Sequence, residues 1–223
     1  MPWINKFIKY KKTYFDGGGL LQDHELLAER RFLTTAPHFV APRKIDNRDM
    51  CLKTDDQGTT SQCAAYSTAG FAEFQHWKIK HYPEQINPDP IYQEAKRIDG
   101  NNSLGTYLKS ATQAVINLGL MDGTPKHIGK SELDIQFAIH QYGVCIGGFM
   151  ITDEWNLVEK SNGKISISSN ARQLGGHAVL LTGYDNEGLY IQNSWSESWG
   201  IYGFAILPWE LFNRQIMDAM VIA

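Results

Sequence analysis

The chain has 223 residues, which is enough for one sizeable domain or for two lobes that share a cleft. Apolar residues make up 43% and charged residues 20%, as in ordinary globular proteins, and the net charge of −3 excludes the basic surface typical of nucleic-acid-binding proteins. Three cysteines are too few for a disulfide framework and favour a reducing compartment.

The first 41 residues differ from the rest of the chain. Lysines and aromatic residues alternate up to Tyr14, three glycines follow, and residues 23–33 have helical spacing behind Asp23 as an N-cap. We interpret residues 1–41 as an extension, either a pro-segment or a clasp, on a domain that spans residues 42–223.

The basic N-terminus predicts no secretory signal peptide, because its longest unbroken apolar run is two residues. We therefore expect a cytoplasmic protein, or one exported by a non-classical route, without a transmembrane segment. One alternative stays open: Trp3, Ile4, Phe7 and Ile8 would share one face of a helix on a membrane surface. At about three turns the helix is short for stable surface binding, so membrane association is not expected.

Helices are expected in the middle third of the chain. Residues 62–79 carry small side chains among aromatic ones, which favours a central, closely packed helix. Asp89 and Pro90 predict the start of a second helix, with Pro90 at its first position. Ser131 and Asp134 stand in capping-box register. Three further helices are thus expected, over 89–98, 105–119 and 131–143.

Strands are expected in the last third. The β-forming runs, divided by turn residues, are 143–150, 176–184, 188–195 and 202–208. Residues 184–188, Tyr-Asp-Asn-Glu-Gly, fit a hairpin loop between two of these strands. A helical first part followed by an antiparallel second part predicts an α+β protein of two lobes.

Cys63 lies where turn-forming residues lead into the helix expected over residues 62–79. A thiol attacks a carbonyl as the thiolate, and the positive end of a helix lowers the pKa of a thiol in its first turn. Thr60 or Ser61 is placed to cap that helix. For Cys51 and Cys145, which lack such a position, the expected role is that of small core residues.

His177 differs from the other histidines because it opens a strand directly after two glycines, which allow another polypeptide segment to approach closely. Asn193 follows sixteen residues later, at the end of the return strand of the hairpin. The hairpin brings the two positions together, so the asparagine carbonyl can accept from the imidazole and fix its tautomer.

Three stretches resemble the active-site blocks of papain-like cysteine peptidases. They are QGTTSQC at 57–63, GGHAVLLTGYD at 175–185 and IQNSWSESWGIYGFAILP at 191–208. The resemblance implies a helical N-terminal lobe with a central helix, an antiparallel β-rich C-terminal lobe and an active site in the cleft between them. Thr60 stands where the family has a cysteine, so the usual disulfide is not expected.

The resemblance also implies a role for each candidate catalytic residue. Cys63 is the nucleophile with a depressed pKa, His177 is its acid–base partner, and Asn193 orients the imidazole. The side-chain amide of Gln57, together with the backbone N–H of Cys63, forms an oxyanion hole. Trp195 covers the histidine–asparagine hydrogen bond.

The substrate-binding residues expected by the same resemblance are Gly105, Thr106, Gly176 and Trp195. The leading hypothesis is an endopeptidase that cleaves protein or peptide substrates through a thioacyl-enzyme. Two alternatives stay open: an acyl transferase that uses the same cysteine–histidine pair, and a catalytically silent shell that only binds. We expect a monomer with no cofactor and no nucleic-acid partner, and no metal because no ligand cluster has metal-binding spacing.

The extension is too short to build a core of its own, yet it carries apolar side chains such as Leu20 and Leu21. We hypothesise that it lies in the cleft and slows substrate entry, as N-terminal segments do in the resembled family. The alternative is a clasp packed on the back of one lobe.

Overall fold

The structure is a computed structural model that describes residues 19–21, 32–33, 38–161 and 163–223. The possible membrane-surface helix lies outside the described residues, and so does most of the helix expected over 23–33. The last two residues of that helix form the short strand β1 (Phe32–Leu33) instead. This part of the prediction was wrong because β1 pairs in parallel with β3 (Pro125–Ile128), and pairing at a sheet edge overrides local helical spacing.

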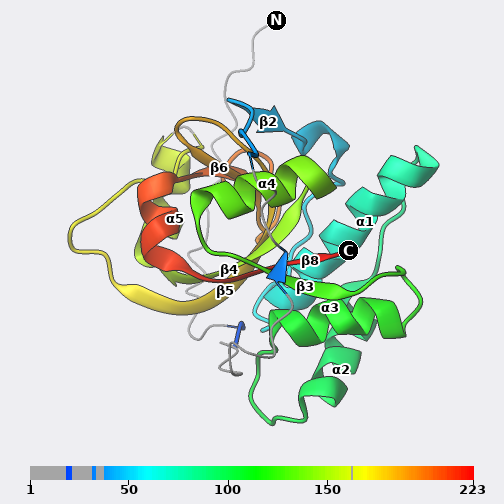
Figure 1. Ribbon diagram of the computed structural model, residues 1–223. Helices are drawn as coiled ribbons and strands as arrows, with labels where there is room; N and C mark the ends of the chain where they lie inside the picture. The colour runs from blue at the N-terminus through cyan, green and yellow to red at the C-terminus, as the bar shows by residue number, and fades with distance from the viewer. Residues whose placement is uncertain (1–18, 22–31, 34–37, 162) are drawn as a thin grey trace, which may run out of the picture.

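Three helices gather on one side of the molecule (Figure 1). They are α1 (Cys63–Lys80), α2 (Pro88–Asp99) and α3 (Leu108–Asn117). Most residues of α1 up to Phe74 are buried, and they include four alanines together with Phe71 and Phe74, which confirms the expected central helix. Small side chains let this helix approach the sheet closely: a Cβ at Gly70 would lie 3.3 Å from Cδ2 of Leu180.

Local sequence signals predicted one helix N-terminus correctly and misplaced another. The predicted capping box of α4 (Glu132–Tyr142) is confirmed: the N–H of Asp134 donates to Oγ of Ser131 at 3.2 Å, and the N–H of Ser131 donates back at 3.4 Å. For α2 the predicted start was too late. Asn87 is the N-cap, its side chain accepts from the N–H of Asp89 at 3.0 Å, and Pro88 follows it directly.

The sheet fills the other side of the molecule. Within the described residues its strand order is β1-β3-β8-β4-β5-β6-β7, with β2 (Ile45–Asp46) paired to β5. The longer strands are β4 (Cys145–Thr152), β5 (Gln173–Tyr184), β6 (Gly188–Gln192), β7 (Phe204–Pro208) and β8 (Ile216–Ile222). From β3 to β7 all neighbours are antiparallel, and the predicted hairpin joins β5 to β6. The predicted α+β architecture is confirmed.

Two elements near the C-terminus have no counterpart among the expected ones. They are α5 (Trp209–Gln215) and the strand β8, which lies between β3 and β4 inside the sheet. Asp218 interrupts the apolar run of β8, and its carboxylate is buried against the imidazole of His127, with Nδ1 and Oδ1 2.9 Å apart. Because an acidic residue interrupts the apolar run and its partner is distant in the sequence, the local pattern does not predict a buried strand here.

Two short 3₁₀ helices, η2 (Arg48–Met50) and η3 (Asp153–Ser161), complete the described elements. In the described part of the chain, no helix has the length and apolar character that crossing a bilayer requires. Cys51, Cys63 and Cys145 are all described and are free thiols.

Replacing Ser131 by alanine is expected to lower the free energy of unfolding by about 1 kcal/mol, because the variant loses the hydroxyl that caps α4. Urea unfolding measures the change. Ser169→Ala, at an exposed position outside any helix, is the matched control and should stay within about 0.5 kcal/mol of the parent chain. Equal unfolding free energies of the two variants would contradict a stabilising cap.

Glu73 places a carboxyl group on the buried side of α1. The residue is 7% exposed, and the carboxyl accepts from the backbone N–H of Ile86 at 2.8 Å. Burial raises the pKa of this carboxyl to about 7, and the hydrogen bond from Ile86 opposes the rise only in part. A group whose pKa is raised on folding contributes stability that is complete below its unfolded pKa, near 4.5, and is lost as the pH rises through about 7.

Glu73→Gln, which mimics the protonated carboxyl, should therefore remove that pH dependence. Between about pH 5 and about pH 8, the unfolding free energy of the parent chain is expected to fall relative to that of the variant. Denaturant unfolding at several pH values measures the difference. Glu94→Gln, at a partly exposed position of α2 where hydrogen bonds from Arg97 and Asn117 lower the pKa of the carboxyl, is the control and should not reproduce the effect. A constant difference across the pH range would show that Glu73 stays ionised in the fold.

Candidate active site

Cys63 is the first residue of α1, and its side chain is fully buried. Neither Thr60 nor Ser61 caps the helix, contrary to the expectation: Gln62 is the N-cap and makes no side-chain capping bond. The hydroxyl of Thr60 donates instead to the carbonyl oxygen of Gln57 at 2.7 Å, which closes the turn before the helix. The thiol thus lies at the positive end of an 18-residue helix.

His177 and Asn193 are joined by a hydrogen bond. His177 lies on β5 opposite Phe149 of β4, and Asn193 directly follows β6. Nε2 of the imidazole is 2.7 Å from Oδ1 of Asn193. The same Oδ1 accepts from the backbone N–H of Ser194 at 2.8 Å, which fixes the orientation of the amide. Because an amide oxygen only accepts, the neutral ring carries its proton on Nε2.

The contact between α1 and β5 brings the thiol beside the histidine strand. The backbone N–H of Ala178, the residue after His177, hydrogen-bonds to the sulfur of Cys63. Burial nevertheless raises the pKa of the thiol to about 12, although the N–H groups of Ala178, Ala64 and Cys63 itself favour the thiolate.

Burial acts on the imidazole as well. It lowers the pKa of His177 to about 4, and the hydrogen bond with Asn193 opposes this without reversing it. Burial therefore favours the neutral form of both Cys63 and His177. This differs from the depressed thiol pKa that the resemblance implies, because both groups are removed from water.

Gln57 links the turn before α1 to the segment after β6. Its Nε2 donates to the carbonyl oxygen of Thr60 at 2.7 Å, while its Oε1 accepts from the hydroxyl of Ser194. The backbone N–H of Gln57 also donates to the carbonyl oxygen of Ser194 at 2.9 Å. Ser194 was not among the expected site residues, and its position between Asn193 and Trp195 is the one signal that points to it.

Aromatic rings surround the imidazole. Trp195 lies across it, with ring centroids 4.7 Å apart and planes inclined by 30°. The fully buried Trp155 stands edge-on to the same ring, at 6.0 Å and 89°, and stacks on Trp199 at 6.3 Å and 25°. Trp195 was expected from its motif, whereas nothing in the local sequence of Trp155 links it to His177.

A short piece of the extension lies between the two lobes. The N–H of Leu21 donates to the carbonyl oxygen of Thr106, and the N–H of Thr106 donates to the carbonyl oxygen of Gly19, both at 3.1 Å. Leu20 and Thr106 thus form a parallel bridge. From the other lobe, the carbonyl oxygen of Gly176 accepts from the N–H of Leu20 at 3.2 Å. Two expected substrate-binding residues therefore hold a peptide backbone between them.

The side chain of Leu20 is enclosed, and the residue is 5% exposed. A Cβ at Gly148 of β4 would lie 2.6 Å from Cδ2 of Leu20 and 3.3 Å from Cδ1 of Leu108. Side chains at Gly105 and Gly176 would meet the backbone of the segment, at 2.3 and 2.4 Å from its carbonyl oxygens. Glycine at these three positions is what allows a chain to lie here.

Among the described residues, no group of three or more histidine, cysteine, aspartate or glutamate side chains is arranged to hold a metal ion. The residues gathered here are instead a thiol, an imidazole and two amides. This set suits nucleophilic and acid–base chemistry at a carbonyl group.

Comparison with known proteins identifies the fold. Neither a protein-family model nor a curated protein matches the sequence. Among solved structures, xylellain, a cysteine protease from Xylella fastidiosa, matches with a TM-score of 0.78 and 19% identity over 96% of this chain and 98% of its own. Procathepsin L 3 of the Tenebrio molitor larval midgut matches with a TM-score of 0.65 and 17% identity, over 87% of this chain and 73% of its own.

A third structure, the recombinant stem bromelain precursor, matches with a TM-score of 0.67 and 15% identity, over 94% of this chain and 77% of its own. Identities this low carry information about architecture alone. The chain has the papain-like two-lobe fold that the three sequence blocks predict.

Proposed function

We propose that the chain is a cysteine endopeptidase that hydrolyses peptide bonds in proteins or peptides. The observation that carries the proposal is the hydrogen bond between His177 and Asn193, on a strand whose next residue, Ala178, has its backbone N–H at the sulfur of Cys63. These three side chains are a nucleophile, an acid–base group and an acceptor that orients the imidazole. The papain-like fold supports the proposal, since xylellain, which shares it, is a cysteine protease.

In the proposed reaction the sulfur of Cys63 attacks the carbonyl carbon of the substrate while the thiol proton passes to Nδ1 of His177. Nε2–H stays bonded to Oδ1 of Asn193, which keeps the ring in one orientation. The imidazolium then protonates the leaving amine as the C–N bond breaks and a thioester forms. Water, deprotonated by His177, cleaves the thioester and releases the carboxylic acid and the thiol.

The amide of Gln57 is proposed as a donor to the oxyanion formed during attack. Nε2 carries two N–H bonds, and one is used by the carbonyl oxygen of Thr60. The second N–H and the backbone N–H of Cys63 are the donors proposed for the oxyanion. Ser194 supports this role because its hydroxyl binds Oε1 and so holds the nitrogen end of the amide in place.

We also propose that the extension inhibits the enzyme from within the chain. Residues 19–21 occupy the N–H and carbonyl groups of Thr106 and the carbonyl group of Gly176, which a substrate backbone would need. The same extension is held elsewhere, because β1 pairs with β3 and Phe39 packs edge-on against Phe137 of α4 at 5.0 Å. We therefore propose that residues 19–21 act as the gate, while Phe32–Leu33 and Phe39 act as the clasp. The enclosure of Leu20 further favours substrates with an apolar side chain at that position.

Leu20→Asp is expected to raise peptidase activity and to speed alkylation of Cys63 by iodoacetamide near pH 6. A carboxylate is unstable in the apolar space beside Gly148 and Leu108, so the segment should leave and water should enter the site. Val40→Asp is the matched control, because it adds the same charge at an 85% exposed position of the extension. Equal rates in the parent chain and both variants would contradict internal inhibition.

Cys63→Ala, made in the Leu20→Asp chain, is expected to lower the turnover rate by several orders of magnitude, because the nucleophile is lost. The fold should be retained. Cys145→Ala is the control for the loss of a buried thiol elsewhere. Peptide hydrolysis and circular dichroism measure the two effects. Residual activity above about a tenth would contradict the assignment.

The same assay separates the alternatives when a large excess of an amine is added. Release of the free carboxylic acid as the main product supports a peptidase. Release of the amide of the added amine as the main product would favour an acyl transferase. A chain that neither turns over peptide nor reacts with a thiol-directed inhibitor would be a binding shell.

A further inference from the structure

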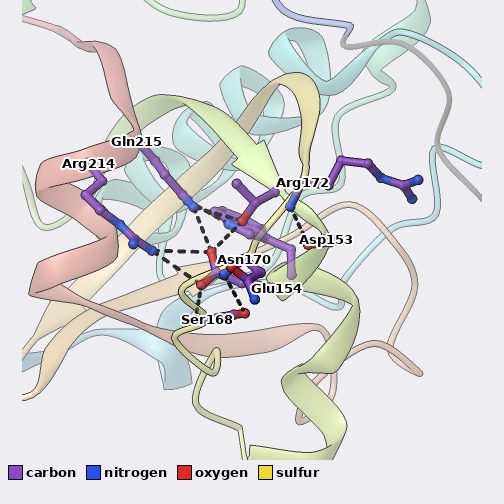
Figure 2. A network of polar contacts seen from close by, with 9 residues as sticks. Asp153, Glu154, Ser168, Asn170, Arg172, Arg214 and Gln215 are labelled. Atoms are coloured by element: carbon purple, nitrogen blue, oxygen red, sulfur yellow. Dashed lines mark hydrogen bonds and ion pairs between the residues drawn. The ribbon is translucent and has the colours of Figure 1, made fainter.

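A polar network outside the candidate site joins η3, α5 and the loop before β5 (Figure 2). Its centre is Glu154, whose side chain has 0% exposure. The carboxylate accepts from the hydroxyl of Thr152 at 2.6 Å, from the backbone N–H of Ser168, and from the side chains of Arg214 and Gln215 at 3.3 and 3.4 Å. A buried carboxylate is costly unless donors replace water, and these groups do so.

Glu154 fixes the orientation of the amide of Gln215. Nε2 of Gln215 donates to Oγ1 of Thr152 at 3.0 Å and to Glu154 at 3.4 Å. Its Oε1 then accepts from the indole N–H of Trp155 at 2.9 Å. Reversing the amide would set two donors face to face at the indole and two acceptors face to face at the carboxylate. The acceptor oxygen of Glu154 therefore selects the amide orientation that holds Trp155.

Two hydrogen bonds hold Trp155 in place. Gln215 accepts from its ring N–H, and its own carbonyl oxygen accepts from the indole N–H of Trp199 at 3.0 Å. The ring held in this way stands edge-on to the imidazole of His177, while Trp195 lies across the face of that imidazole. A displacement of the Trp155 ring would thus change the packing around His177 directly.

We propose that Gln215, oriented by Glu154, is a positioning residue for His177 that acts through the indole of Trp155. The inference rests on the proposed function, because the imidazole is the acid and base in that reaction. A fixed indole restricts rotation of the imidazole and keeps water from its edge. If the network served only to hold α5 against η3, its loss would lower stability without changing the chemistry at His177.

The first test is Gln215→Met in the active Leu20→Asp chain. Methionine keeps the length of the side chain but removes the acceptor of the indole N–H. We expect kcat to fall about tenfold with KM unchanged, as for a small misplacement of a catalytic group. Arg214→Met is the matched control, because Arg214 binds the same Glu154 from a 44% exposed position and does not bond to Trp155. It should lower stability and leave kcat as it is.

A double-mutant cycle tests whether Trp155 transmits the effect. Trp155→Phe keeps an aromatic ring and removes the N–H, so Gln215→Met should have no further effect on kcat in that background. An effect of the same size in both backgrounds would overturn the proposal, as would equal losses of kcat in Gln215→Met and Arg214→Met. If Gln215→Met does not fold, Trp155→Phe alone must show the fall in kcat.

NMR of ¹⁵N-labelled histidine separates this proposal from the proposed function. In the chain that keeps Leu20, burial lowers the pKa of His177 to about 4. A loosened indole that admits water should therefore raise the titration midpoint of His177 in Gln215→Met, made in that chain, and not in Arg214→Met. A raised midpoint in a chain that cleaves no peptide would leave the positioning role intact and overturn the peptidase. An unchanged midpoint would overturn the positioning role whatever the activity.

Discussion

The close packing of α1 against β5 is the constraint on which the rest of the structure depends. It is favoured by glycine at position 70, where a Cβ would make a tight contact, 3.3 Å from Cδ2 of Leu180, and by small residues on the neighbouring turns. This contact sets the first residue of α1 against Ala178, and so fixes how far Cys63 lies from the strand of His177. The hydrogen bonds and aromatic rings of the site orient groups that this packing has already brought together.

The electrostatics of the site follow from the same packing. A helix N-terminus favours a thiolate by about 1 kcal/mol at an exposed position. A thiol pKa that rises from its ordinary value near 9 to about 12 corresponds to about 4 kcal/mol in the other direction. Loss of hydration therefore outweighs the effect of the helix N-terminus on the pKa of the Cys63 thiol. The position of Cys63 in the sequence predicts the effect of the helix N-terminus on its pKa, but it carries no information about the effect of burial.

Contiguous residues made the architecture and the candidate catalytic residues predictable from sequence. The capping box at Ser131, the β5–β6 hairpin and the placing of Asn193 beside His177 each depend on one short stretch. The start of α2 was misplaced because two successive Asx–Pro pairs give the same signal. Strand β8 was missed because a buried aspartate with a remote partner breaks its apolar pattern. The contribution of Trp155 arises from tertiary packing, which no local spacing encodes.

The three glycines that face Gly19 and Leu20 have a consequence for how such a chain evolves. Under the proposed function, substrate and inhibitory segment pass over the same surface of Gly105, Gly148 and Gly176. A side chain at any of these positions would exclude both the substrate and the inhibitory segment. No mutation at these glycines can therefore weaken inhibition without also weakening substrate binding. The strength of inhibition can therefore be changed without loss of substrate binding only through the extension itself.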